Sequence, residues 1–187
     1  MRIISGKLKG KSINFVKSLT TRPLKDSVKE NIFNVLTHSN LFKINLEKSY
    51  VLDLYSGIGS FGIECISRGA AEVTFVEKDK TAINTLKKNL FNLSIQNKSS
   101  IFEKDIADFL NKDQKKKFEI FFLDPPFKDY EYQNYLELIA KQKIFKKNHI
   151  VILHREKKTS EDINKSLNPL LIKEYGRSKI IFGQLLL

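Results

Sequence analysis

The sequence predicts an α/β fold, a Rossmann-like doubly wound sheet of about seven strands that ends in an antiparallel hairpin. Short apolar runs alternate with amphipathic helical segments from residue 50 onward, which is typical of a parallel sheet covered by helices. Glycines and acidic residues follow directly on these runs, where the ligand-binding edge of such a sheet lies. The last two β-type runs are separated only by Gly176-Arg177-Ser178, which is too short for a helical crossover.

Composition favours an intracellular protein. The chain has 187 residues, of which 41% are hydrophobic and 29% charged. No window approaches the roughly 18 apolar residues that a membrane span requires, and the first residues lack a signal-peptide core. The single cysteine excludes a disulfide framework and a cysteine-based zinc site. We therefore expect a cytoplasmic protein, a monomer that does not act at a membrane.

Positive charge is concentrated at the N-terminal end of the chain. The whole chain carries +12, and residues 1–48 hold ten Lys and Arg against three Asp and Glu, a net +7. Such a basic end indicates binding to a polyanion, most simply a nucleic-acid backbone. A lysine-rich composition throughout the proteome is the alternative explanation. We expect residues 1–48 to form an RNA-facing extension and residues 49–187 to form the catalytic domain.

The extension is predicted to be a β-hairpin followed by a helix. Two β-type runs, 2–5 and 11–16, flank a glycine-bearing turn, so Lys7, Lys9 and Lys11 would lie at or near a hairpin tip. Arg22-Pro23 suits the first turn of a helix. Arg22, Lys25 and Lys29 follow at helical spacing and predict a basic stripe, which is either a phosphate contact or an ordinary solvated face.

The remaining elements follow in regular alternation. A strand at 50–52 leads through a glycine-rich loop to a helix that ends near Ser67. The further predicted elements, in order, are a strand at 72–76, a helix at 81–93, a strand at 100–103, a short helix, a strand at 118–123, a helix near 132–141, a strand at 150–153, and strands at about 170–175 and 179–187.

Asp124-Pro125-Pro126-Phe127 follows directly on one of the apolar runs. Proline cannot donate to a sheet ladder, and the residue before it is held extended, so Asp124 is predicted at a strand end on a stiff backbone. Taken alone, the motif either ends a strand or forms part of an active site.

The loop Gly57-Ile58-Gly59-Ser60-Phe61-Gly62 fits a G-x-G-x-x-G pattern, and Glu77 follows about 20 residues later. Both nicotinamide and S-adenosylmethionine proteins use this arrangement. Asp53 favours the second cofactor, because a carboxylate there would repel a pyrophosphate and attract an ammonium group. Asp105, after the third strand of the sheet, is placed to accept a hydrogen bond from an adenine amine.

These residues resemble a known family. Asp53-Leu54-Tyr55-Ser56-Gly57-Ile58-Gly59 is similar to motif I of the class I S-adenosylmethionine-dependent methyltransferases. Asp124-Pro125-Pro126-Phe127 resembles the motif with which some of them methylate exocyclic amines of bases. The chain as a whole is similar to the bacterial 16S rRNA guanine-N2 methyltransferases of the small subunit. The similarity includes the N-terminal hairpin, Arg22-Pro23 with Lys29-Glu30 and Phe33, Ser67-Arg68-Gly69-Ala70, and Phe75-Val76-Glu77-Lys78-Asp79. It departs from the family pattern at Leu24 and Ile58.

The resemblance implies methyl transfer from S-adenosylmethionine, without a metal, to the N2 amine of a guanine in 16S rRNA, with guanine 966 of an assembling small subunit expected. It assigns Asp53, Tyr55, Gly57, Gly59, Glu77 and Asp105 to the cofactor. Asp124 and the Pro125 carbonyl would accept the two N–H bonds of the amine, and Phe127 would stack on the base. The predicted RNA contacts are Lys7, Lys9, Lys11, Arg22, Lys25 and Lys29.

Three other functions remain open from the sequence. A DNA adenine-N6 methyltransferase uses similar chemistry, but no stretch is large enough for a DNA-recognition domain. A nicotinamide oxidoreductase would be separated by cofactor binding. A non-catalytic RNA-binding assembly factor would be separated by a methyl-transfer assay.

Overall fold

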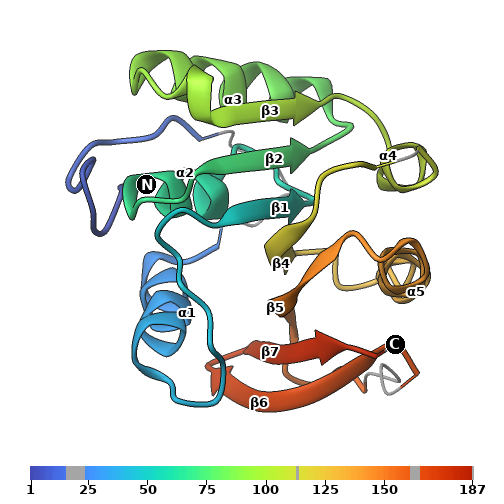
Figure 1. Cartoon of the computed structure of the whole chain (residues 1–187). Helices are drawn as coiled ribbons and strands as arrows, with labels where there is room; N and C mark the ends of the chain where they lie inside the picture. The colour runs from blue at the N-terminus through green and yellow to red at the C-terminus, as the bar shows by residue number, and fades with distance from the viewer. Residues whose placement is uncertain (16–23, 113, 161–164, 187) are drawn as a thin grey trace.

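A seven-stranded sheet organises the molecule (Figure 1). The computed structural model describes residues 1–15, 24–112, 114–160 and 165–186. The strand order is β3-β2-β1-β4-β5-β7-β6, and β7 runs antiparallel to both of its neighbours. The strands are β1 (Tyr50–Leu54), β2 (Glu72–Val76), β3 (Ser99–Phe102), β4 (Phe118–Leu123), β5 (Phe145–Glu156), β6 (Leu167–Tyr175) and β7 (Ser178–Leu185). The predicted doubly wound sheet with a C-terminal hairpin is confirmed.

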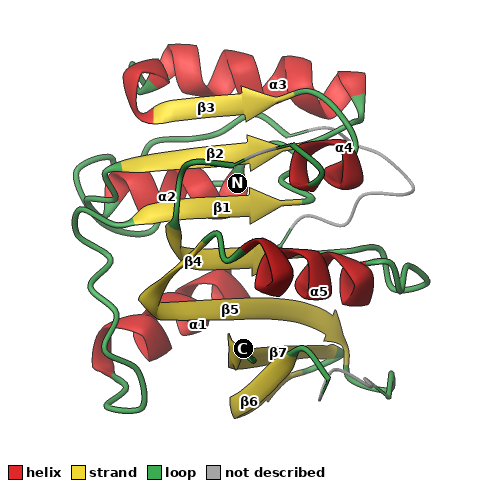
Figure 2. Cartoon of the chain, turned by 45° about the vertical axis from the view of Figure 1, so that its right-hand side comes forward, coloured by secondary structure: helices red, strands yellow, loops and turns green. Residues whose placement is uncertain are grey.

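Helices cover both faces of the sheet and make a three-layer structure, with α4 and α5 in front of the sheet and α1 behind it in Figure 2. Side chains alternate along each strand, so each face has its own apolar cluster. One cluster joins α1, α2 and α3 to the sheet, and the other joins α4 and α5 to it. The helices are α1 (Asp26–His38), α2 (Ser60–Ser67), α3 (Lys80–Asn92), the 3-10 turn η1 (Gln96–Lys98), α4 (Ile106–Leu110) and α5 (Tyr132–Gln142).

The N-terminal segment differs from the predicted hairpin of two strands. Only the pair Arg2 and Ser12 forms an antiparallel bridge within the described part of this segment. The backbone N–H groups of Ile4 and Ser5 donate to the Glu64 carboxylate at 2.8 and 2.9 Å, and that of Lys7 donates to the Ser67 carbonyl at 2.7 Å. These donors are used by α2, so they are not available to a strand ladder.

Two predicted boundaries also differ. The predicted helix start at Arg22-Pro23 lies outside the described residues, and α1 begins at Asp26. Strand β5 has 12 residues and extends well beyond the predicted four. It continues through His154 and Arg155, two polar residues that are buried because both have polar partners nearby.

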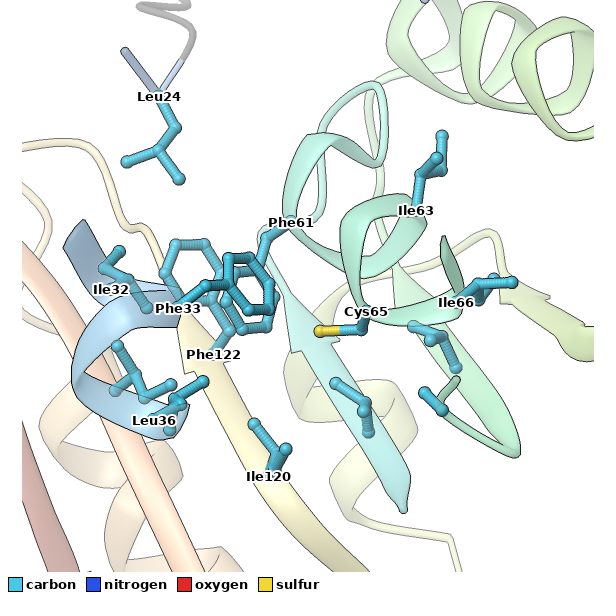
Figure 3. Packing of buried hydrophobic residues seen from close by; sticks show 14 of the residues in the cluster. Leu24, Ile32, Phe33, Leu36, Phe61, Ile63, Cys65, Ile66, Ile120 and Phe122 are labelled. Carbon is cyan, nitrogen blue, oxygen red and sulfur yellow. The ribbon is translucent and has the colours of Figure 1, made fainter. Parts of the chain in front are cut away.

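Three stacked rings join α1 and α2 to β4 (Figure 3). Phe33 stacks on Phe61 with ring centroids 5.2 Å apart, and Phe61 stacks on Phe122 at 4.0 Å. The Arg68 guanidinium lies over the Phe33 ring at 4.4 Å. Because Phe61 lies in the first turn of α2 and Phe122 lies two residues before Asp124, this stack fixes the glycine-rich loop relative to the end of β4.

The N-terminal extension shares this core. Ile3, Ile13 and the apolar face of α1 belong to the same cluster as the strand residues on that face. The division into residues 1–48 and 49–187 remains a prediction. Within the described part of the chain, no helix is both long and apolar enough to cross a membrane.

Candidate active site

Four predicted carboxylates lie at the strand ends in sheet order. Asp105 follows β3, Glu77 follows β2, Asp53 is the residue before the last in β1, and Asp124 follows β4. Since β3, β2, β1 and β4 are parallel neighbours, these residues lie along one edge of the sheet. The structure therefore brings together the acidic residues that the sequence indicates.

The glycine-rich loop turns sharply at this edge. Gly57 and Gly59 have φ angles of +54° and +84°, a region that side-chain-bearing residues seldom adopt. A Cβ atom on Gly59 would lie 2.4 Å from a Leu86 methyl group, whereas one on Gly57 would meet nothing within 4 Å. The positive φ of Gly59 and its closely packed surroundings both disfavour a side chain there, whereas Gly57 leaves the loop backbone open to a ligand.

Glu77 holds the loop in place. Its Oε2 atom accepts a hydrogen bond from the Gly57 N–H at 2.8 Å, and its Oε1 atom accepts from the N–H groups of Lys78 and Asp79. Tyr55, which is half-buried, adopts a positive φ of 59° just before the loop. Such strain in a residue with a side chain is often found at ligand sites.

Asp53 is the buried centre of the site, with a side chain on the α2 face of the sheet. Its Oδ2 atom accepts a hydrogen bond from the Gly62 N–H at 3.0 Å. Its Oδ1 atom is buried and has no hydrogen-bond partner among the described residues. Burial raises the pKa of this carboxyl well above its usual value, and the nearby Asp124 and Glu77 raise it further against the opposing Gly62 bond.

Asp105 lies farther along the edge and already has partners. It caps α4 through the Ala107 N–H, pairs with the Lys78 ammonium at 2.8 Å and accepts from the Tyr135 hydroxyl at 3.3 Å. The hydrogen bond from Lys78 is the main cause that lowers the Asp105 pKa. An adenine amine would have to share this carboxylate with Lys78.

Asp124 is hydrogen-bonded to a histidine that is not among the predicted site residues. Its Oδ1 atom lies 2.7 Å from Nδ1 of His154, and Nε2 of His154 lies 2.9 Å from the Ser178 hydroxyl oxygen. Phe127 is partly exposed and meets the His154 ring edge-on, with centroids 6.2 Å apart. The Phe127 ring therefore lies beside the histidine that is hydrogen-bonded to Asp124, and it keeps an exposed surface on which a base could stack.

Arg155 fixes the backbone that follows Asp124. Its guanidinium donates to the Pro126 carbonyl at 3.1 Å and to the Phe127 carbonyl at 2.8 Å. It also lies over the rings of Tyr132 and Tyr130 at 4.7 and 5.3 Å. A buried cation on β5 thus reinforces the stiffness that the two prolines give to this loop.

The structure corrects one of the predicted RNA contacts. Lys29 is completely buried, and its ammonium lies 3.0 Å from the Arg2 carbonyl and 3.6 Å from the Glu64 carboxylate. Desolvation lowers its pKa, although Glu64 and Asp26 oppose that effect. Because it has no exposed surface, Lys29 is not part of a phosphate-binding stripe.

The other predicted lysines reach the surface. Lys25 precedes α1, whereas Lys7, Lys9 and Lys11 lie in the segment that packs beside the C-terminal end of α2. That end is the one farther from Gly59, so these three lysines lie away from the edge that carries Asp124 (Figure 1). Arg22 lies outside the described residues.

His154 and Arg155 are site residues outside the sequence-based prediction, although the sequence carries a signal for them. Both come directly after the apolar run Ile150-Val151-Ile152-Leu153, as Asp124 comes after its own apolar run, and β5 is the neighbour of β4 in a doubly wound sheet. Asn89 gave no such signal, because its partners are backbone groups 75 and 31 residues away. Glu64 has Arg68 four residues later as a local partner, but its bonds to Ile4 and Ser5 span about 60 residues. No cluster of three metal-ligating side chains occurs within the described residues.

Comparison with known proteins places the chain in a family. A model of the family described as conserved hypothetical protein 95 matches residues 1–184. The chain belongs to this family. Its relatives include proteins named ribosomal RNA small subunit methyltransferase D. The one from Buchnera aphidicola subsp. Baizongia pistaciae is 35% identical over 98% of this chain and 90% of its own length. The Haemophilus influenzae protein is 35% identical over 84% of this chain and 79% of its own.

Solved structures share the fold of this chain over nearly its whole length. HI0767 from Haemophilus influenzae is 29% identical, and the match covers 98% of this chain and 97% of that one with a TM-score of 0.77. The Escherichia coli protein yhhF is 24% identical and shares the fold over 99% and 97% of the two chains, with a TM-score of 0.84. The family resemblance and the fold class predicted from the sequence are confirmed.

Proposed function

We propose that the protein transfers a methyl group from S-adenosylmethionine to the N2 amine of a guanine in 16S rRNA. The observation that carries this proposal is the position of Asp124-Pro125-Pro126-Phe127 beside Asp53 at one sheet edge. Names of relatives that describe ribosomal RNA methyltransferases support the substrate class. The family resemblance specifies guanine 966 as the target.

The residues present fit this cofactor. The Oδ1 atom of Asp53, which is buried and has no hydrogen-bond partner in the described part of the chain, is suited to an ammonium group such as that of the methionyl portion. Gly57 leaves room for close approach to the loop backbone. Glu77 and Asp105 offer acceptors for ribose hydroxyls and an adenine amine. We propose these residues, with Tyr55 and Gly59, as the cofactor site.

S-adenosylmethionine, when bound, supplies a methyl group already activated by its sulfonium, so the protein needs mainly to prepare the amine. The exocyclic nitrogen shares its lone pair with the guanine ring and must turn toward tetrahedral geometry. Asp124 and the Pro125 carbonyl would accept its two N–H bonds and direct the lone pair to the methyl carbon. Such alignment contributes on the order of 7–11 kcal/mol in well-oriented systems.

The nitrogen held by Asp124 and the Pro125 carbonyl would bond to the methyl carbon as the carbon–sulfur bond of the cofactor broke, and the electron pair of that bond would stay on sulfur. The nitrogen carries a surplus proton, which Asp124 or water accepts. Phe127 would hold the base by stacking. A guanine within a helix must first be flipped out or presented from a loop. We further propose that the protein acts as a cytoplasmic monomer on an assembling small subunit.

The variant Asp124→Ala tests the proposal. It should bind S-adenosylhomocysteine as the wild type does in calorimetry, and it should lose transfer of labelled methyl groups to unmodified small-subunit RNA. Asp108→Ala, which removes an exposed carboxylate on α4, is the matched control and should stay active. A fully active Asp124→Ala would overturn the role of Asp124.

Mass mapping of rRNA modifications, with and without this protein in the cell, tests the target. Loss of one N2-methylguanine at position 966 is the expected result. Unchanged rRNA together with methylated adenine in DNA would favour the DNA methyltransferase. A wild-type protein that binds RNA but transfers no methyl group to any RNA would favour an assembly factor.

A further inference from the structure

The carboxylate of Asp124 is the first member of a chain of three polar side chains from three strands. Asp124 contacts His154 at 2.7 Å, and His154 contacts Ser178 at 2.9 Å. The parallel register pairs Leu123 with Leu153, which places the residue after β4 beside the next residue of β5. The antiparallel register of β5 and β7 brings the start of β7 to the same point.

The location of one proton follows from the chemistry of these groups. An ionised carboxylate can only accept hydrogen bonds, so Nδ1 of His154 must carry the hydrogen that bonds to Asp124. A serine hydroxyl can either donate or accept, so Ser178 satisfies Nε2 whether or not that nitrogen is protonated. His154 can therefore keep its Nδ1–H bond to Asp124 whether Ser178 donates to Nε2 or accepts from it.

The side chains of His154 and Asp124 lie on the same face of the sheet, and the imidazole bonds to one of the two carboxylate oxygens. His154 follows the alternation of Ile150 and Ile152, whose side chains lie on the α2 face, and Asp124 follows that of Ile120 and Phe122 on the same face. The imidazole binds Oδ1, and no hydrogen bond to the second oxygen occurs among the described residues. That second oxygen remains for a substrate N–H.

Arg155 points to the other face of β5, where it holds the carbonyls of Pro126 and Phe127. Two consecutive residues of β5 thus act on the same loop. Arg155 fixes the backbone, and His154 fixes the side chain that would meet the amine. The Arg155 contacts would suffice to stabilise the loop backbone. The His154 contact adds nothing to the backbone and instead orients the Asp124 side chain.

We propose that His154 is a positioning residue for methyl transfer, which acts by donating Nδ1–H to Asp124 and so aligning its free oxygen with the guanine amine. This inference rests on the proposed function. It concerns the turnover step rather than RNA or cofactor binding, because His154 is buried behind Asp124. A misplacement of the order of 1 Å at a reacting group costs about 100-fold in rate.

Two variants of His154 separate a positioning role from a structural one. His154→Leu removes the donor, and it should lower kcat by about 10- to 100-fold while KM for RNA and Kd for S-adenosylhomocysteine stay within about threefold. His154→Asn places an amide N–H near the position of Nδ1 and should recover most of kcat. His149→Asn, a buried histidine farther from Asp124 on β5, is the control and should keep wild-type kcat.

The melting temperature of each variant identifies any loss that comes from unfolding, and turnover is measured below the lowest of them. A His154→Leu variant with wild-type kcat would overturn the inference, as would a folded His154→Asn variant that is as slow as His154→Leu. A rise in KM alone would also overturn it. If the wild type transfers no methyl group in the same assay, the proposed function fails instead.

Discussion

Asp53 combines two properties that usually exclude one another, near-complete burial and a carboxylate oxygen without a partner among the described residues. A buried polar group without a hydrogen bond costs about 1–3 kcal/mol. The Gly62 N–H satisfies only one of its oxygens. The unsatisfied oxygen of Asp53 therefore lowers the stability of the folded protein, and a bound ammonium group would offset this loss.

Asp53→Asn should change stability and cofactor binding in opposite directions. Because the folded state raises the Asp53 pKa, the unfolded chain loses this proton first, from a pH of about 4. The wild-type free energy of unfolding is therefore reduced as pH rises from there through the folded pKa. The Asn side chain has no proton to lose. In urea unfolding at several pH values, the free energy of unfolding of Asp53→Asn should therefore increase relative to that of the wild type as pH rises.

The same variant should bind S-adenosylhomocysteine more weakly, by about 1.5–3 kcal/mol, because it lacks a hydrogen bond between charged groups. Wild-type affinity should increase as pH rises through the Asp53 pKa, and the variant should lack this increase. Calorimetry at several pH values measures both effects. Equal affinities in the two proteins would remove Asp53 from the cofactor site.

Helix α2 connects the cofactor loop to the N-terminal extension. Its first turn follows Gly59, and its second turn carries Glu64, which accepts from the N–H groups of Ile4 and Ser5 and pairs with Arg68 at 2.8 Å. The side chains of Glu64 and Lys29 are both fully buried. One short helix therefore joins the proposed cofactor site to the segment that is proposed to meet RNA.

Glu64→Gln should be strongly destabilising, because it leaves the Lys29 ammonium buried without a full counter-charge. Breaking one partner of a buried pair costs about 3–5 kcal/mol. The double variant Lys29→Met/Glu64→Gln should recover part of that loss. Glu103→Gln removes one partner of an exposed pair with Lys87 and should cost less than about 1 kcal/mol. Urea unfolding measures all three, and equal costs for the two single variants would contradict the prediction.

At the scale of the whole molecule, repeated patterns made the sheet predictable from the sequence. Apolar runs that end in acidic residues indicate parallel strands, and Gly176-Arg177-Ser178 identifies the terminal hairpin. Asp53, Glu77, Asp105 and Asp124 could be placed at one edge because parallel strands share it. The N-terminal hairpin was overestimated, because the carboxylate that takes its donors lies 60 residues away in the chain.

The burial of Lys29 could not be predicted for the same reason. Its counter-charge and its hydrogen-bond partners, Glu64, Ser60 and the Arg2 carbonyl, come from other elements. The helical spacing of Arg22, Lys25 and Lys29 describes a stripe on an isolated helix and says nothing of what packs against it. The burial of Lys29 is therefore determined by tertiary contacts and not by its position on the helix.

RNA binding should depend on the surface lysines of the extension. Replacement of Lys7, Lys9 and Lys11 by Gln should weaken RNA binding and reduce the slope of log affinity against log salt by about 0.7–0.9 for each phosphate that is no longer neutralised. Since these lysines lie away from the Asp124 edge, kcat should stay unchanged at saturating RNA. Filter binding at several salt concentrations measures the slope.

The matched control replaces Lys141, Lys143 and Lys173 by Gln. The first two lie at the end of α5 on the opposite face of the sheet, and the third lies on the edge strand β6. The net charge changes equally in the two triple variants. Equal slopes in both would mean that the extension contributes only through its overall charge.

The Asn89 side chain has a consequence for how the chain folds during synthesis. It exchanges two hydrogen bonds with the backbone of Asn14 and donates a third to the Ile58 carbonyl in the glycine-rich loop. These partners are 75 and 31 residues away in the sequence. Closing such long loops costs entropy that is recovered only when the distant partner is present. The N-terminal segment is synthesised first, and its contacts with α2 can precede those of Asn14, which require α3 to have left the ribosome. Asn89 thus links the completion of this docking to the position of the cofactor loop.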